Sequence, residues 1–146
     1  MLAETIQCES EDVDVALKAA RAAYESWSKL SGHERAKYLY SIARHIQKHH
    51  RLFAVVEALD NGKSIRETRD ADVNLVARHF YHHAGWAELL EEEYPGWTRL
   101  VENLLCIYLS LGSVGVVSAI VPWNFPLMLL TWKVNIRRHP QQEVPM

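Results

Sequence analysis

The most limiting feature of this sequence is a long uncharged segment near its C-terminal end. No residue from Leu104 to Trp132 carries a charge, whereas charged side chains are spread along the chain before it. Continuous apolar runs of this kind form either strands that are buried on both faces or a helix that crosses a membrane. The fold therefore depends on which of these two the segment forms.

Hydropathy alone would assign a membrane span to the eighteen residues from Leu104 to Val121. Small and polar residues inside the stretch, such as Gly112 and Ser113, and its β-branched second half favour strands instead. We expect strands over residues 104–111 and 114–121, and the membrane-anchored helical domain is the less favoured alternative.

The first part of the chain shows helical periodicity with capping signals. We expect a first helix over residues 11–28, capped by Ser10. The apolar face of this helix would consist of Val13, Leu17, Tyr24 and Trp27. A second helix should follow the Ser31–Glu34 capping box as far as about His50, and a short third helix should end at Asn61-Gly62. A long fourth helix should begin with the capping-box spacing of Ser64–Glu67 and end near Glu92, where Tyr94-Pro95-Gly96 closes it.

Composition excludes several classes of protein. With 146 residues, 49% hydrophobic and 23% charged, the chain has the composition of one globular domain. A net charge of -2 gives no basic field that would attract nucleic acid. Two cysteines, Cys8 and Cys106, do not make a secreted disulfide scaffold, and Met1–Ser10 lacks the apolar core of a signal peptide. We therefore expect a cytoplasmic protein.

One short motif indicates chemistry. In Ile120–Pro126 an asparagine, Asn124, stands between two prolines at the end of an apolar run. Each proline restricts its own φ and biases the preceding residue toward extended geometry, so the side-chain amide is rigidly aimed. A rigid donor suits the stabilisation of an oxyanion. The plainer alternative is a turn asparagine that caps a helix beginning at Phe125.

Four blocks in register resemble the aldehyde dehydrogenase superfamily. One block combines Gly115-Val116-Val117, the motif itself and Leu127–Lys133, and the three upstream blocks are Ala19–Tyr24, Leu59–Lys63 and Tyr81–Ala87. It covers residues 11–134, the opening part of such an enzyme, and is lost after Val134. It implies an α/β fold in which N-terminal helices precede the first strands of an incomplete Rossmann-like cofactor domain. Residues 1–10 and 135–146 would be disordered tails. Arg69–Val73 is most like the tandem-domain branch called family sixteen.

The resemblance also implies a reaction. Members of the family oxidise an aldehyde with NAD or NADP through a cysteine thiolate, and a glutamate activates water. Asn124 matches the family's oxyanion donor, and Lys133 matches a lysine assigned to proton relay. The residues that match the cofactor cleft are Ile120, Val121, Pro122 and Trp123. An aldehyde substrate and association with aldehyde dehydrogenase subunits are the implied partners.

The machinery for this reaction is incomplete in the 146 residues. No cysteine follows Asn124, and Cys106 precedes the motif in an apolar run, where a buried thiol resists ionisation. The family's water-activating glutamate is also missing. We expect a truncated, inactive polypeptide; the alternative is a helical module that pairs with a full-length relative. The pairs His45/His49 and His79/His83 have one-turn spacing that could bind zinc, but packing or solvated histidines are the favoured interpretation.

Overall fold

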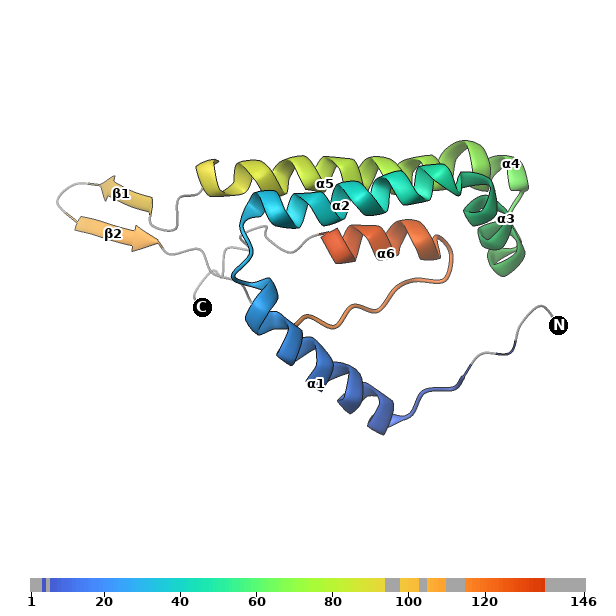
Figure 1. Cartoon of the computed structure of the whole chain (residues 1–146), viewed down its shortest axis with the longest axis horizontal. Coiled ribbons are helices and arrows are strands. Elements are labelled where there is room, and N and C mark those ends of the chain that lie inside the picture. Colours follow the sequence, from blue (N-terminus) through green and yellow to red (C-terminus); the bar gives the residue numbers. More distant parts are fainter. Residues whose placement is uncertain (1–3, 5, 94–97, 103–104, 110–114, 136–146) are drawn as a thin grey trace.

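The computed structural model describes residues 4, 6–93, 98–102, 105–109 and 115–135. The elements are α1 (Ser10–Trp27), α2 (Gly32–Lys48), α3 (His50–Asn61), α4 (Ile65–Glu67), the π-helical η1 (Thr68–Asp72), α5 (Val73–Glu93), β1 (Thr98–Glu102), β2 (Leu105–Leu109) and α6 (Pro126–Asn135). Helices dominate these residues, and two short strands follow α5 in the sequence and lie beyond its C-terminal end, away from the packed helices (Figure 1). The helix positions predicted from periodicity are confirmed to within a few residues.

Local capping explains where α2 and α3 begin and end. At the start of α2, the Ser31 N–H donates to Glu34 Oε2 at 2.9 Å, and the Glu34 N–H donates to Ser31 Oγ at 3.2 Å. These hydrogen bonds form the predicted capping box. The Ser31 N–H and the Ser31 hydroxyl, which also donates to Glu34 Oε2 at 3.0 Å, lower the pKa of the Glu34 carboxyl. Helix α3 ends at Gly62, whose φ of 78° lies in the left-handed region that glycine adopts without strain.

Two details of the helical prediction were wrong. Helix α1 is capped by Glu9 and not by Ser10, because the Asp12 carboxylate accepts the Glu9 N–H at 2.9 Å. The predicted long helix from Ser64–Glu67 is interrupted by the π-helical turns of η1. A π-helical turn contains an extra residue, and the stretch has no proline or glycine from which the interruption could be predicted.

The core lies where α2, α3, α5 and α6 meet. Figure 1 shows α2 and α5 running side by side, with α6 beside them and α1 projecting away. The buried cluster consists of Ala43, Ile46, Ala54, Val73, Val76, Ala77, Phe80 and Met128. Small residues on α2 and α3 let α5 approach closely, and Met128 brings α6 onto the same core. The predicted apolar face of α1 has no buried residue; Trp27 makes a ring contact with Tyr38 of α2 at 5.4 Å between centroids.

Only one of the two predicted strands forms. β2 falls inside the first predicted run and pairs antiparallel with β1, from Thr98 opposite Leu109 to Glu102 opposite Leu105. The second predicted strand is wrong for the described part of its range, since residues 115–121 carry no strand. A strand needs a neighbour that completes its backbone hydrogen bonds, and no described segment pairs with this one. The apolar pattern indicated burial without specifying a partner.

The predicted tails lie largely outside the described residues. Residues 1–3 and 5 and residues 136–146 are not described, and neither are Tyr94, Pro95 and Gly96. The tail boundaries need one correction at each end, because Ser10 begins α1 and Asn135 ends α6. Among the helices that the structure describes, none has the length and apolar character needed to span a membrane.

Candidate functional site

The Asn124 motif forms a turn that leads into α6. Residues 120–122 are without regular structure, residues 123–125 form a bend, and α6 begins at Pro126. Proline suits this first helical position, where its missing N–H is not needed. The Phe125 carbonyl accepts the Leu129 N–H at 2.9 Å, so Phe125 occupies the cap position. The Asn124 amide makes no hydrogen bond to the described residues, so it does not cap the helix as the plainer alternative required.

The side chains of the motif are accessible. Asn124 and Pro122 are exposed and Val121 is half-buried. Ile120 is 90% exposed and Trp123 is 83% exposed, so the described residues leave both almost uncovered. Lys133 is exposed about two turns along α6, and it is not brought to the Asn124 turn. The five consecutive site residues from Ile120 to Asn124 thus lie together at the turn, and the sixth predicted residue, Lys133, lies apart from them.

Side chains at the C-terminal end of α3 and just after it contact this turn. Asn61 Nδ2 donates to the Trp123 carbonyl at 2.6 Å, joining residues that are 62 positions apart. The Lys63 ammonium lies 3.2 Å from the centroid of the Phe125 ring, a cation–π contact. The same ammonium pairs with the buried Asp72 carboxylate at 2.9 Å. Contacts therefore reach the turn on both sides of Asn124.

Glu57 of α3 is the most unusual group near the turn. Its side chain is buried, with 6% exposure, and Oε1 has no hydrogen-bond partner within the part of the chain that is described. The backbone N–H of Leu127, in the first turn of α6, faces this carboxylate and favours its charged form. Burial raises the pKa of the Glu57 carboxyl, and the Leu127 N–H and the Lys63 ammonium partly oppose that rise. A raised pKa shows that ionised Glu57 is costly here.

The sequence motifs do not single out Glu57, Asn61 and Lys63 as residues that contact the Asn124 turn. Asn61 belongs to a helix-stop signal and to the Leu59–Lys63 block of the family resemblance, which also contains Lys63, and Glu57 belongs to no motif. The spacing of Glu57 and Asn61, one helical turn apart, places both on one face of α3. A polar pair on one face of a short helix was the available signal.

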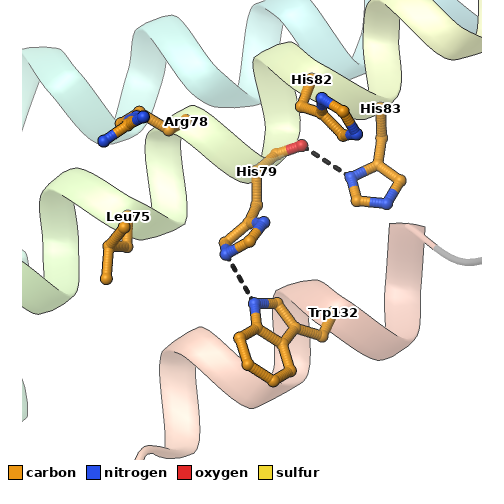
Figure 2. A pocket seen from close by; sticks show the side chains of 6 residues that line it. All are labelled: Leu75, Arg78, His79, His82, His83 and Trp132. Atoms are coloured by element: carbon orange, nitrogen blue, oxygen red, sulfur yellow. Dashed lines mark hydrogen bonds between the residues drawn. The ribbon is translucent and has the colours of Figure 1, made fainter.

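A second feature is a hollow between α5 and α6, which is lined by Leu75, Arg78, His79, His82, His83 and Trp132. Figure 2 shows His79 reaching from α5 toward Trp132, whose Nε1–H donates to His79 Nε2 at 2.6 Å. Burial lowers the pKa of His79, and the nearby His83, His82 and Arg78 lower it further. His79 Nε2 is therefore occupied as an acceptor. The described residues contain no set of three or more His, Cys, Asp or Glu side chains that could hold a metal ion.

Comparison with known proteins decides which family carries this turn. The model of the aldehyde dehydrogenase family matches residues 1–137. The chain belongs to this family. It is 40% identical to an acetaldehyde dehydrogenase of Pseudomonas aeruginosa over 91% of its own length and 26% of that protein's. It is 42% identical to acetaldehyde dehydrogenase 2 of Cupriavidus necator, over 85% of its length and 24% of that protein's. The chain thus spans about a quarter of the length of the curated relatives it matches.

Solved structures of the family support the same fold. PnpE from Pseudomonas sp. WBC-3 superposes with a TM-score of 0.81 at 32% identity, covering 92% of this chain and 27% of PnpE. Betaine aldehyde dehydrogenase from Staphylococcus aureus, solved in complex with NAD+, gives a TM-score of 0.73 at 33% identity, covering 86% of this chain and 25% of that one. The predicted family membership is confirmed. The assignment to the tandem-domain branch stays a prediction.

Proposed function

We propose that residues 11–134 form the N-terminal part of an NAD- or NADP-dependent enzyme that oxidises an aldehyde to a carboxylic acid. The observation that carries this proposal is the Asn124 turn in a chain of this family. The turn is contacted on one side by Asn61, the last residue of α3, and on the other by Lys63, just after α3, while the Asn124 amide is exposed and makes no hydrogen bond to the described residues. A donor that is held in place and uncommitted suits a developing negative charge. We also propose a cytoplasmic location.

In this proposal Asn124 acts on the carbonyl oxygen of the aldehyde. When a thiolate adds to the carbonyl carbon, the oxygen gains negative charge, and an amide N–H that is already aimed at it stabilises that charge. A preorganised donor does not have to reorient as the charge forms. The amide is most effective once the site is closed to water, because a hydrogen bond to a charge is stronger where water is excluded.

The residues before Asn124 fit one wall of a cofactor site. Ile120 and Trp123 expose apolar surface next to the amide, which suits contact with the flat ring of a nicotinamide. Bound NAD or NADP would supply the hydride acceptor. Lys133 is exposed on α6, so any part in proton relay requires that it reach the site through solvent or further residues.

The remaining catalytic groups of the family do not occur in these 146 residues. No cysteine follows Asn124, and Cys106 precedes it. Cys8 is exposed, but it lies in the N-terminal segment and not after the Asn124 turn. A polypeptide of these residues alone should therefore form no NADH or NADPH. Incubation of the purified polypeptide with NAD or NADP and a panel of aldehydes tests this, and steady NADH or NADPH formation above a blank would contradict it.

A chimera tests the positive part of the proposal. Residues 1–134 would replace the matching N-terminal part of the Pseudomonas aeruginosa acetaldehyde dehydrogenase. We expect NADH formation from acetaldehyde, and a fall in kcat of about 10²–10³-fold in Asn124→Ala. The control is Asn74→Ala, which removes an exposed amide that donates to the carbonyls of Arg69 and Asp70. Full kcat in Asn124→Ala would refute the assigned role.

A second candidate function is a non-catalytic module that pairs with a full-length relative. The exposed apolar side chains Val117, Ile120 and Trp123 favour it, since such residues gain by being covered. Size-exclusion chromatography of the polypeptide mixed with an intact relative distinguishes the two readings of this surface. Co-elution would support pairing, whereas separate elution would contradict it.

A further inference from the structure

Three residues at the end of α3 contact the two sides of the Asn124 turn. Glu57 and Asn61 share one face of the helix, and Gly62 then turns the chain in a left-handed conformation so that Lys63 points back toward the turn. The three groups reach three different points, namely the Trp123 carbonyl, the Phe125 ring and the Leu127 N–H. Asn124 lies between the first two of these points.

The Asn61 contact bears most directly on the orientation of Asn124. The Trp123 carbonyl belongs to the peptide group that joins Trp123 to Asn124, and this group is planar. A donor held 2.6 Å from that carbonyl therefore restricts the plane that also contains the Asn124 N–H and Cα. When this peptide plane is restricted, the only freedom left to the Asn124 side chain is the choice among its own rotamers.

The other two contacts restrict the chain after Asn124. The Lys63 ammonium contacts the face of the Phe125 ring and also pairs with the Asp72 carboxylate. This ion pair therefore fixes the position of the cation against the ring. The Leu127 N–H favours the charged form of the Glu57 carboxylate, and an acid near a helix N-terminus is stabilised by the helix dipole. Together these contacts set where α6 starts relative to α3.

The Glu57 contact is difficult to explain as a device for stability alone. Burying a carboxylate whose Oε1 finds no partner among the described residues costs free energy of folding, and a neutral residue of similar shape would avoid that cost. A charged acceptor does, however, form a stronger hydrogen bond to a backbone N–H than a neutral one does. The buried Glu57 carboxylate therefore lowers the stability of the fold while it holds the turn firmly.

We propose that Glu57, Asn61 and Lys63 form a clamp that orients the Asn124 amide, and that they are positioning residues for the oxyanion donor. The clamp spans the turn from the Trp123 carbonyl to the first turn of α6. This inference rests on the proposed function. Weakening the clamp should lower kcat and leave the KM for the aldehyde nearly unchanged, because the donor acts mainly in the transition state.

The first experiment measures how strongly the Asn124 amides are restricted in the full 146-residue chain. Nitrogen-15 relaxation would give the order parameters of the Asn124 backbone and side-chain amides. We expect lower order in Asn61→Ala and Lys63→Met, and unchanged order in Lys63→Arg, which keeps the cation. Unchanged order in Asn61→Ala and Lys63→Met would overturn the clamp. Circular dichroism melts would identify any variant that fails to fold, and Glu57→Gln, which keeps an acceptor oxygen, would then replace it.

The second experiment is a double-mutant cycle in the chimera. Asn61→Ala should lower kcat on the order of tenfold, less than removal of the donor itself. In an Asn124→Ala background the same change should lower kcat no further, because there is no donor left to orient. An equal loss in both backgrounds would show a merely structural role and overturn the clamp. Full kcat in Asn124→Ala would instead refute the proposed function, so the two failures are distinguishable.

Discussion

Replacement of Thr68 by valine should lower the free energy of unfolding by about 1 kcal/mol. Thr68 is fully buried in η1, and its Oγ1 donates to the Ala54 carbonyl of α3 at 2.9 Å. Valine has nearly the same shape and the same branching at Cβ, so it leaves no cavity and keeps the helix propensity. The same Oγ1 also lies 3.3 Å from the Ile65 carbonyl, one turn earlier in the chain, so the hydroxyl is shared between a local acceptor and Ala54. The change therefore removes the shorter, inter-element bond together with a longer local one.

The expected loss in free energy of unfolding depends on which hydrogen bonds the Ala54 carbonyl keeps after the substitution. As a carbonyl within α3 it keeps its helical hydrogen bond, so Thr68→Val does not strand it completely and the cost stays near the average for one net hydrogen bond. A loss of 1 kcal/mol corresponds to about a fivefold change in the folding equilibrium and to a melting temperature lower by roughly 2–4 °C.

Thr131→Val is the matched control. Thr131 is 1% exposed, but its Oγ1 donates to the Met128 carbonyl within the same helix. Such local bonds compete with the backbone and contribute little, so we expect a change within about 0.5 kcal/mol. Urea denaturation followed by circular dichroism measures both variants. If Thr68→Val and Thr131→Val cost the same, the reasoning about the inter-element bond is wrong.

Three further predictions concern caps and charge. Ser31→Ala should cost about 1 kcal/mol by removing the capping box, as measured by urea denaturation. Gly62→Ala should destabilise by about 1–2 kcal/mol because of its φ of +78°, whereas Gly85→Ala inside α5 should stabilise slightly; both added methyl groups meet open space, so equal effects would contradict the backbone explanation. The pKa of His79 is lowered from its ordinary 6.5, first by burial and then by neighbouring positive charges, so the unfolded chain binds the proton before the folded chain does. Stability should therefore be lost as the pH falls below that value, with protonation also breaking the hydrogen bond from Trp132, and His79→Gln should flatten the pH dependence of the melting temperature.

Much of the helical architecture could be predicted from local signals. The Ser31 box and the Gly62 stop act within a few residues, and the burial of Val76 and Phe80 follows from helical spacing. The Asn124 motif was also visible, because two prolines restrict it wherever the chain folds. These features depend on interactions between near neighbours, which any reading of the sequence includes.

Pairing and burial of the remaining parts were decided by tertiary contacts. The apolar run that includes residues 115–121 indicated burial, but strand formation depends on a partner that periodicity does not name. The burial of Glu57 and the bond from Asn61 to Trp123 arise only when α6 packs against α3 and α5. Helical capping and spacing are local, so the sequence by itself determined which segments are helices and that the Asn124 motif interrupts the chain between two prolines. Contacts over sixty residues depend on how those helices pack, and for that reason only the tertiary structure revealed that Asn61 donates to the carbonyl just before that asparagine.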